Sequence, residues 1–155
     1  MKNLKSPPPH LTSHIGYWMR MVSNHVSYAF ARKLAASDVT VAEWVVLREM
    51  YGAETKIAPS AIATLTGLTR GAVSKLVDRL LEKKLVTRKD ASGDRRFQEI
   101  ELTPKALLLT PKLAALADEN DEEFFAALTK AERKTLTHLL RKVADTHQLK
   151  TAPIS

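Results

Sequence analysis

The sequence has 155 residues, of which 45% are hydrophobic and 26% are charged, and its net charge is +7. This length is sufficient for one ordinary core, and the composition is typical of a globular, helix-rich protein. The apolar runs are too short to span a membrane, and the absence of cysteine excludes a disulfide framework and a thiol-based redox sensor. We therefore expect a cytoplasmic protein that does not contact membranes.

The first third of the chain predicts two helices. Residues 1–10 contain three consecutive prolines and no apolar signal segment, so we expect a flexible tail there. Apolar residues spaced at threes and fours predict a long helix over 11–37. Thr40 and Glu43 have the spacing of a capping box, which starts a second helix that Gly52 is expected to end.

The middle of the chain predicts two helices joined by a tight turn. Pro59 is expected to open a short helix, and Thr69 is expected to cap a longer one. Gly67 lies in the turn between them, where glycine allows a positive φ. Ala63 is small enough for the helices to cross closely, and Val73 begins a buried stripe on the second helix. This pattern predicts a helix-turn-helix, although other helical hairpins share it.

A basic β-hairpin follows this helix pair. Alternating segments around 85–89 and 97–102 predict its two strands, and the residues "SGD" between them supply the turn. Arg95 and Arg96 follow that turn, which does not need them. A helix-turn-helix followed by a hairpin is a winged helix, and arginines at the hairpin tip can enter a narrow minor groove. Alternatively, Asp94 and the two arginines form a solvated ion cluster.

The charges are segregated along the chain. Nine basic and four acidic residues lie between Arg70 and Arg96, whereas the segment 105–123 holds two basic and five acidic residues. Such segregation indicates a polyanionic partner for the middle of the chain, and the start of the second helix is where a recognition helix meets base edges. We expect DNA contacts from Thr69, Arg70, Ser74, Lys75, Arg79, Arg95 and Arg96.

Two further helices are predicted in the last third of the chain. A Thr-Pro pair at 103–104 starts the first, and a kink is expected at Pro111. Thr129 and Glu132 form another capping box, which opens the last helix. This helix carries an apolar stripe of Leu136, Leu139, Leu140 and Val143. The segment 149–155 is expected to fray.

The residues described so far resemble the MarR-type winged-helix transcriptional regulators. The resemblance covers nearly the whole chain, and its strongest match is "GDRRFQEIELT". This segment fits the wing signature of that family, an aspartate, any residue and an arginine before a strand ending in Leu-Thr. The resemblance implies that Asp94 braces the wing and that Arg96 enters the minor groove. It also implies that "LTRGAVSKLVDRLLEKKLV" is the recognition helix.

The family resemblance implies a homodimer joined through the two ends of the chain. The predicted fold class is mainly α with a small β wing. A winged helix-turn-helix lobe at 38–103 is flanked by a first dimerisation helix at 11–37 and by two more at 104–148.

The resemblance further implies a small-molecule pocket between the dimerisation helices and the lobe. We expect an aromatic or carboxylate effector, and Arg20 or Arg48 would suit a carboxylate by bidentate pairing. Alternatively, the aromatic and aliphatic side chains of the first helix belong to the core or to the dimer interface, which is the better interpretation of any one of them. The candidate pocket residues are Tyr17, Trp18, Arg20, Met21, His25, Trp44, Arg48 and Met50.

No metal, cofactor or catalytic site is expected. His10 and His14 are spaced like ligands on one helical turn, but no cysteine or carboxylate lies near them in sequence. The chain lacks a recognisable nucleophile triad, phosphate-binding glycine loop or pair of catalytic carboxylates. An enzyme is therefore not expected.

These expectations combine into one predicted function. The protein is expected to be a homodimeric transcriptional regulator that binds palindromic operators in double-stranded DNA as a repressor and is released by a small ligand. One alternative is a winged-helix module that binds an acidic protein. Another is a DNA-packaging protein that has no ligand and little sequence preference.

Overall fold

The computed structural model describes residues 6–52, 56–90 and 97–155. Within these residues the chain is mainly helical, as predicted, and a small three-stranded sheet accompanies six α-helices. The elements, in chain order, are a 3-10 turn η1 (Leu11–Ser13), α1 (Ile15–Ala35), α2 (Val41–Gly52), β1 (Lys56–Ile57), α3 (Pro59–Thr66), α4 (Arg70–Glu82), β2 (Val86–Asp90), β3 (Gln98–Leu102), α5 (Pro104–Phe124) and α6 (Lys130–Thr146).

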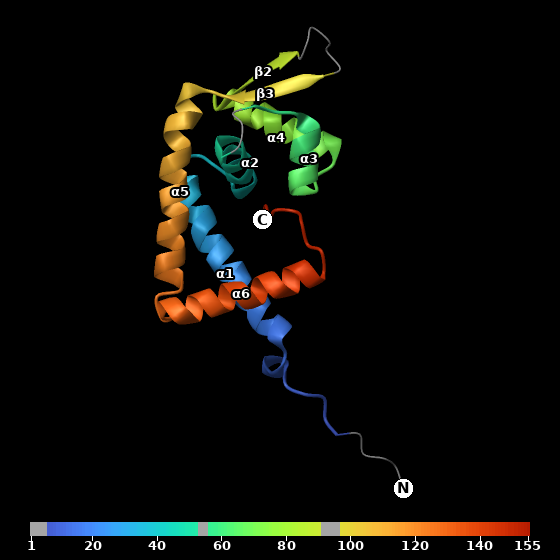
Figure 1. Ribbon diagram of the computed structural model, residues 1–155, viewed down its shortest axis with the longest axis vertical. Coiled ribbons are helices and arrows are strands. Elements are labelled where there is room, and N and C mark those ends of the chain that lie inside the picture. Colours follow the sequence, from blue (N-terminus) through green and yellow to red (C-terminus); the bar gives the residue numbers. More distant parts are fainter. Residues whose placement is uncertain (1–5, 53–55, 91–96) are drawn as a thin grey trace.

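The elements form a winged-helix lobe carried on three outer helices. The winged-helix lobe consists of α2, α3, α4 and the strands, and Figure 1 shows the β2–β3 hairpin projecting from it. The long helix α5 descends from the end of β3 and packs against α1 and α2, while α6 crosses below the lobe (Figure 1). None of the described helices is long and apolar enough to cross a membrane.

Side-chain caps start the helices where the sequence predicts them. Thr69 Oγ1 accepts a hydrogen bond from the backbone N–H of Ala72, and Thr103 Oγ1 accepts one from the N–H of Ala106, each at 3.2 Å. Thr129 begins α6 with a complete capping box. These bonds satisfy N–H groups that have no partner inside a helix, so short polar residues define the helix starts.

The sheet contains one strand that the sequence did not predict. The strand order is β1-β3-β2 and all pairs are antiparallel, with Ile57 opposite Ile100 and Val86 opposite Leu102. Strand β1 has two residues, which is too short for an alternating pattern to be detected. Its pairing with β3 places the start of α3 beside the wing.

The core lies where the winged-helix lobe meets α1 and α5. The apolar stripe of α4 is buried, as predicted, and includes Leu76 and Leu80, which are fully shielded from solvent. Leu34 from α1 and Leu113 from α5 are also fully buried. Helices α1 and α5 therefore share the core of the winged-helix lobe.

The ends of the chain differ from the expectations. The first α-helix begins at Ile15 and not at Leu11, because His14 adopts an extended backbone after η1. Helix α5 is assigned as one helix through Pro111, where a kink was expected.

The segment 149–155 was expected to fray, and this prediction is wrong. The segment turns back onto the winged-helix lobe, where the N–H of Ala152 donates a hydrogen bond to the carbonyl oxygen of Leu65 at 2.8 Å. Thr151 lies against Gly67, which has a φ of +71° in the turn after α3. Backbone pairing with a distant helix end leaves no local pattern in the sequence, so this docking could not be predicted.

Candidate nucleic-acid interface

The turn before α4 presents the first residues of this helix to solvent. Helix α3 ends with Gly67 in the left-handed conformation, whose N–H donates to the carbonyl of Ala63 at 2.8 Å. The hydroxyl of Thr66 also accepts a hydrogen bond from the N–H of Leu68 at 3.3 Å. Thr69 then caps α4, so Arg70 stands exposed at its first position. This is the geometry of a helix-turn-helix, with glycine where the sequence predicts it.

A basic groove lies between α4 and the wing. Its cavity volume is about 1060 Å³, and α3, α4 and all three strands contribute to its walls. Arg70 and Ser74 enter it from α4, Arg88 from β2 and Lys56 from β1, and one carboxylate, Glu99 of β3, also lines it. The aromatic ring of Phe97 is largely exposed at the start of β3 and also lines the groove. Basic groups around a polar hydroxyl suit a phosphate-bearing partner.

The predicted DNA-contacting residues are placed differently from one another. Arg70 and Ser74 lie together in the groove, and Thr69 acts as the helix cap. Lys75 is exposed on α4 but is not one of the residues lining the groove. The predicted wing-tip residues Asp94, Arg95 and Arg96 lie outside the described residues.

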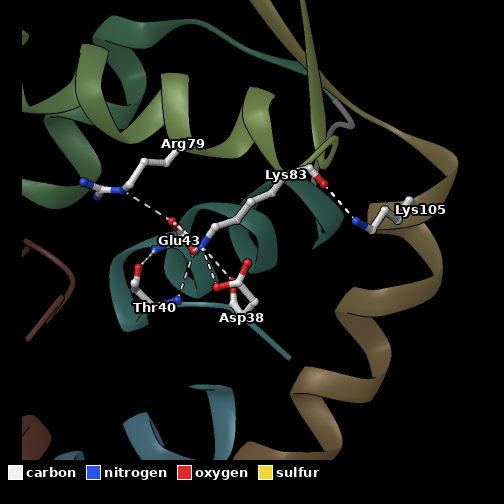
Figure 2. A network of polar contacts seen from close by, with 6 residues as sticks. All are labelled: Asp38, Thr40, Glu43, Arg79, Lys83 and Lys105. Carbon is white, nitrogen blue, oxygen red and sulfur yellow. Dashed lines mark hydrogen bonds and ion pairs between the residues drawn. The ribbon is translucent and has the colours of Figure 1, made fainter. Parts of the chain in front are cut away.

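Arg79 is directed to the opposite side of α4 from the groove. Its Nε lies 3.4 Å from Oε1 of Glu43, a carboxylate of α2 that is fully buried (Figure 2). The side chain of Lys83, one turn further along α4, bonds the same carboxylate. The guanidinium of Arg79 therefore has an intramolecular partner, which its predicted role in DNA contact did not anticipate.

Sequence reasoning missed two basic residues of the groove. Arg88 lies two residues after the buried Val86 on β2, so the two side chains share the face of the strand that meets α4. Its Nη1 lies 3.6 Å from Oδ1 of Asp78 on that helix. The period of two in β2 could have identified Arg88. Lys56 belongs to β1, where it pairs with Glu99 of β3 at 3.6 Å. Because β1 itself was not predicted, Lys56 could not be placed.

The predicted effector pocket is not assembled as expected. Met50 is 1% exposed and belongs to the core, and its place in an effector pocket stays a prediction. The sequence around Met50, in the middle of α2, did not indicate which face of that helix is buried. Trp44 is half-buried and meets Phe30 edge to face, with ring centroids 6.0 Å apart.

The α1 candidates for the pocket lie along an exposed part of that helix. Trp18 is half-exposed, packs edge to face on Tyr17 and donates its indole N–H to the carbonyl of Thr12 at 2.9 Å. His25 bonds the carbonyl of Met21 at 2.7 Å. The remaining two candidates, Arg20 and Arg48, are both exposed.

A second groove, of about 540 Å³, lies beside α1. None of the eight predicted pocket residues lines it. It is formed by polar and small side chains of α1, by Val41 at the start of α2, and by the docked segment 149–155. Its lining residues are Ser23, Asn24, Ser27, Tyr28, Ala31, Val41, Ile154 and Ser155.

The two histidines with metal-like spacing do not share a helix. His10 and His14 flank η1, and both adopt extended backbone conformations. Within the described ranges 6–52, 56–90 and 97–155, no group of three or more histidine and acidic side chains is arranged to hold a metal ion.

Comparison with known proteins places this architecture in a family. The model of the MarR family matches residues 37–96, which is most of the winged-helix lobe. A candidate transcriptional regulatory protein for the hcr operon of Thauera aromatica is 24% identical over 133 residues, covering 86% of this chain and 80% of that protein.

Two solved structures resemble the whole fold. A mutant of MarR from E. coli, in complex with operator DNA, has 27% identity and a TM-score of 0.73, covering 83% of this chain and 92% of its own. BpsR of Bordetella bronchiseptica, described with its regulation by 6-hydroxynicotinic acid, has 24% identity and a TM-score of 0.75 over 90% of this chain and 99% of its own.

These relatives are regulators of transcription and not enzymes, in agreement with the prediction from sequence. The family model matches the helix-turn-helix and the strand that follows it, and the structural match to MarR extends over 83% of this chain. The match to the family model and the shared fold therefore identify residues 37–96 as a MarR-family winged-helix domain, as found in DNA-binding transcriptional regulators.

Proposed function

We propose that this protein is a homodimeric repressor that binds palindromic operators and releases them when a small aromatic acid binds. The groove between α4 and the wing carries the proposal, because it gathers Arg70, Ser74, Arg88 and Lys56 beside the start of the recognition helix. Arginine and serine are residue types that contact bases and phosphates. We expect Thr69, Lys75 and the wing-tip arginines to extend this face along the duplex.

Exposed apolar side chains support the homodimer. On α6, the predicted stripe of Leu136, Leu139, Leu140 and Val143 is 37% to 52% exposed, and no residue of this helix is buried. Ile15 on α1 is also exposed. An apolar surface of this extent is unusual on a monomer, and two copies could cover it by pairing α1 and α6. A two-fold dimer then presents two recognition helices to the two halves of a palindrome.

Ligand release is supported by the relatives and by the position of the second groove. BpsR is described as responding to 6-hydroxynicotinic acid, which combines an aromatic ring with a carboxylate. The groove beside α1 lies where the outer helices approach the winged-helix lobe. A ligand there would shift the spacing of the two recognition helices only if it binds one spacing more tightly than the other.

Selection from random duplexes tests the proposal. We expect enrichment of an inverted repeat whose half-sites are centred about 10 base pairs apart, one helical turn. In Arg70→Ala, binding to the enriched duplex should weaken by about 1–3 kcal/mol, because the variant lacks one arginine contact. The matched control is Lys130→Ala, which removes an exposed cation from the start of α6, away from the groove. It should leave affinity unchanged.

The alternatives make different predictions in the same experiment. A DNA-packaging protein would bind all duplexes with similar affinity and enrich none. A module for an acidic protein would not bind duplex DNA at all. Either outcome contradicts the proposal, and so would an enriched site without a dyad. Addition of 6-hydroxynicotinic acid or related aromatic acids to the complex then tests release, which the DNA-packaging alternative does not predict.

A further inference from the structure

A buried carboxylate lies at the base of the recognition helix. Glu43 belongs to the first turn of α2, and its side chain is completely shielded from solvent. Its Oε2 accepts hydrogen bonds from the backbone N–H of Thr40 at 3.0 Å and from Nζ of Lys83 at 2.9 Å. Its Oε1 accepts from the same Lys83 at 3.1 Å and lies 3.4 Å from Nε of Arg79 (Figure 2).

Capping of α2 does not require this arrangement. The same chain contains a second capping box, in which Thr129 and Glu132 exchange hydrogen bonds of 3.2 Å. Glu132 is exposed, so a cap of equal geometry forms without burial and without a cationic partner among the residues that the structure describes. Burying a charged group is costly unless it is paired. Helix capping therefore does not explain why Glu43 is buried, nor why two cations pair with it.

The two cations that pair with Glu43 both come from the end of α4. Arg79 and Lys83 are one turn apart at the carboxyl end of α4, where cations are also favoured by the helix dipole. Lys83 Nζ donates in addition to the carbonyl of Asp38 at 2.7 Å, in the link between α1 and α2. Glu43 and Lys83 thereby connect the end of α4 to the start of α2.

The same end of α4 is connected to α5. The carbonyl oxygen of Lys83 accepts a hydrogen bond from Nζ of Lys105 at 2.9 Å (Figure 2). The carbonyl of Lys84 accepts one from the hydroxyl of Thr103, the cap of α5, at 2.7 Å. The α4 junction, defined as Asp38, Thr40, Glu43, Arg79, Lys83 and Lys105, is thus the point where the recognition helix meets an outer helix.

The α4 junction has the directional contacts that can fix the direction in which α4 points. The apolar stripe of α4 packs without strong directional preference, whereas hydrogen bonds to a carboxylate fix distances and angles. Helix α4 has 13 residues and is therefore about 20 Å long. A small rotation at its carboxyl end moves Arg70 at the other end by a larger amount. Ion pairs of this kind contribute little to stability but can select one arrangement.

We propose that Glu43 is a positioning residue for DNA recognition, which sets the angle of α4 through Arg79 and Lys83 and fixes it relative to α5. This inference rests on the proposed function as an operator-binding protein. Glu43 itself touches no DNA in this assignment, because it is buried on the side of α4 away from the groove. Its loss should therefore reduce discrimination between DNA sequences more than it reduces general attraction to DNA.

The variant Glu43→Gln tests this role, with Glu132→Gln as the matched control in the exposed capping box. The probes are the duplex enriched by the wild-type protein and a duplex of scrambled sequence. We expect Glu43→Gln to bind the enriched duplex about tenfold more weakly, while its affinity for the scrambled duplex and its salt dependence stay close to those of the wild type. Glu132→Gln should match the wild type on both duplexes.

A double variant separates positioning from folding. Glu43→Gln leaves Lys83 with only the exposed carboxylate of Asp38, at 3.7 Å, as a charged partner and is itself destabilising, so the second variant combines Glu43→Gln with Lys83→Met. This pair retains an acceptor for the Thr40 N–H and removes the lysine charge that lost its buried partner. We expect it to fold as stably as the wild type, judged by urea unfolding, and still to bind the enriched duplex about tenfold more weakly.

Two outcomes are decisive. If the stable double variant discriminates between the duplexes as the wild type does, Glu43 has only a structural role and the inference is wrong. If the wild-type protein enriches no duplex at all, the proposed function fails before the variants are compared. The two failures are therefore distinguishable.

Discussion

The apolar residues of α4 and α6 repeat at the same helical spacing, but their surroundings differ. On α4, the residues Val73, Leu76, Val77 and Leu80 are 0% to 2% exposed, since α2, α3 and the sheet surround them. On α6, the corresponding stripe is 37% to 52% exposed. One stripe is covered by its own chain, and the other has no such cover within the described residues. Equal patterns can therefore serve a core in one case and, as we propose, a subunit interface in the other.

The covered stripe is expected to dominate stability. Leu80→Ala should lower the free energy of unfolding by about 2–5 kcal/mol, because it removes a fully buried side chain and leaves a cavity. Urea unfolding followed by circular dichroism measures this change. The matched control is Leu108→Ala on α5, at a position that is 73% exposed, where the loss should be small. Equal losses at the two positions would contradict the burial of the α4 stripe.

The exposed stripe is expected to control association. Leu140→Glu should raise the dimer dissociation constant at least about a hundredfold, because an unpaired charge inside the interface costs several kcal/mol. Sedimentation velocity at several concentrations measures the change. The single chain should keep its helical content, since Leu140 is 43% exposed there.

Lys134→Glu provides the matched control for the exposed stripe. This residue lies on the opposite side of α6, so it changes the charge of the same helix without entering the apolar stripe. We expect it to leave the dimer intact. If both variants dissociate equally, net charge and not the stripe controls association.

The smallest expected effect lies at an ion pair between α1 and α5. Nζ of Lys33 donates to Oε2 of Glu123 at 2.6 Å, and this hydrogen bond, with the lysine charge, lowers the pKa of the Glu123 carboxyl. A group with a lowered pKa in the folded state stabilises it above the unfolded pKa, and this contribution disappears as the pH falls through the folded pKa. The pair is exposed, so its contribution should be slight.

Comparison of the wild type with Glu123→Gln measures this contribution. The wild type should be slightly more stable at neutral pH, and the difference should disappear in acid, once the pH has fallen through the lowered pKa of Glu123. A difference that persists in acid would indicate that the amide alters packing around Lys33. Urea midpoints at the two pH values decide between these outcomes.

The sequence predicted those features that depend on nearby residues. The capping boxes at Thr40 and Thr129, the cap at Thr69 and the turn at Gly67 each depend on residues within a few positions, and the structure confirms them. The charge pattern likewise drew attention to α4, where Arg70 and Ser74 lie in the groove.

The features that were missed depend on distant contacts. Glu43 has the spacing of a capping residue, and nothing near it in sequence indicates that Lys83 will cover it. The burial of Met50 was missed because residue type alone does not reveal which face of α2 is buried. Lys56 could not be placed because β1 exists only through its pairing with β3.

The docked segment 149–155 has a consequence for the order in which the chain folds. Its hydrogen bond from Ala152 to Leu65 joins the two halves of the chain, so it cannot form until nearly all of the sequence has left the ribosome. Residues 41–102 emerge earlier and contain the apolar stripe of α4 and both hairpin strands. Contacts within that lobe close shorter loops and should form first during synthesis. Docking of 149–155 would then be a late step, completed only after α6 has emerged.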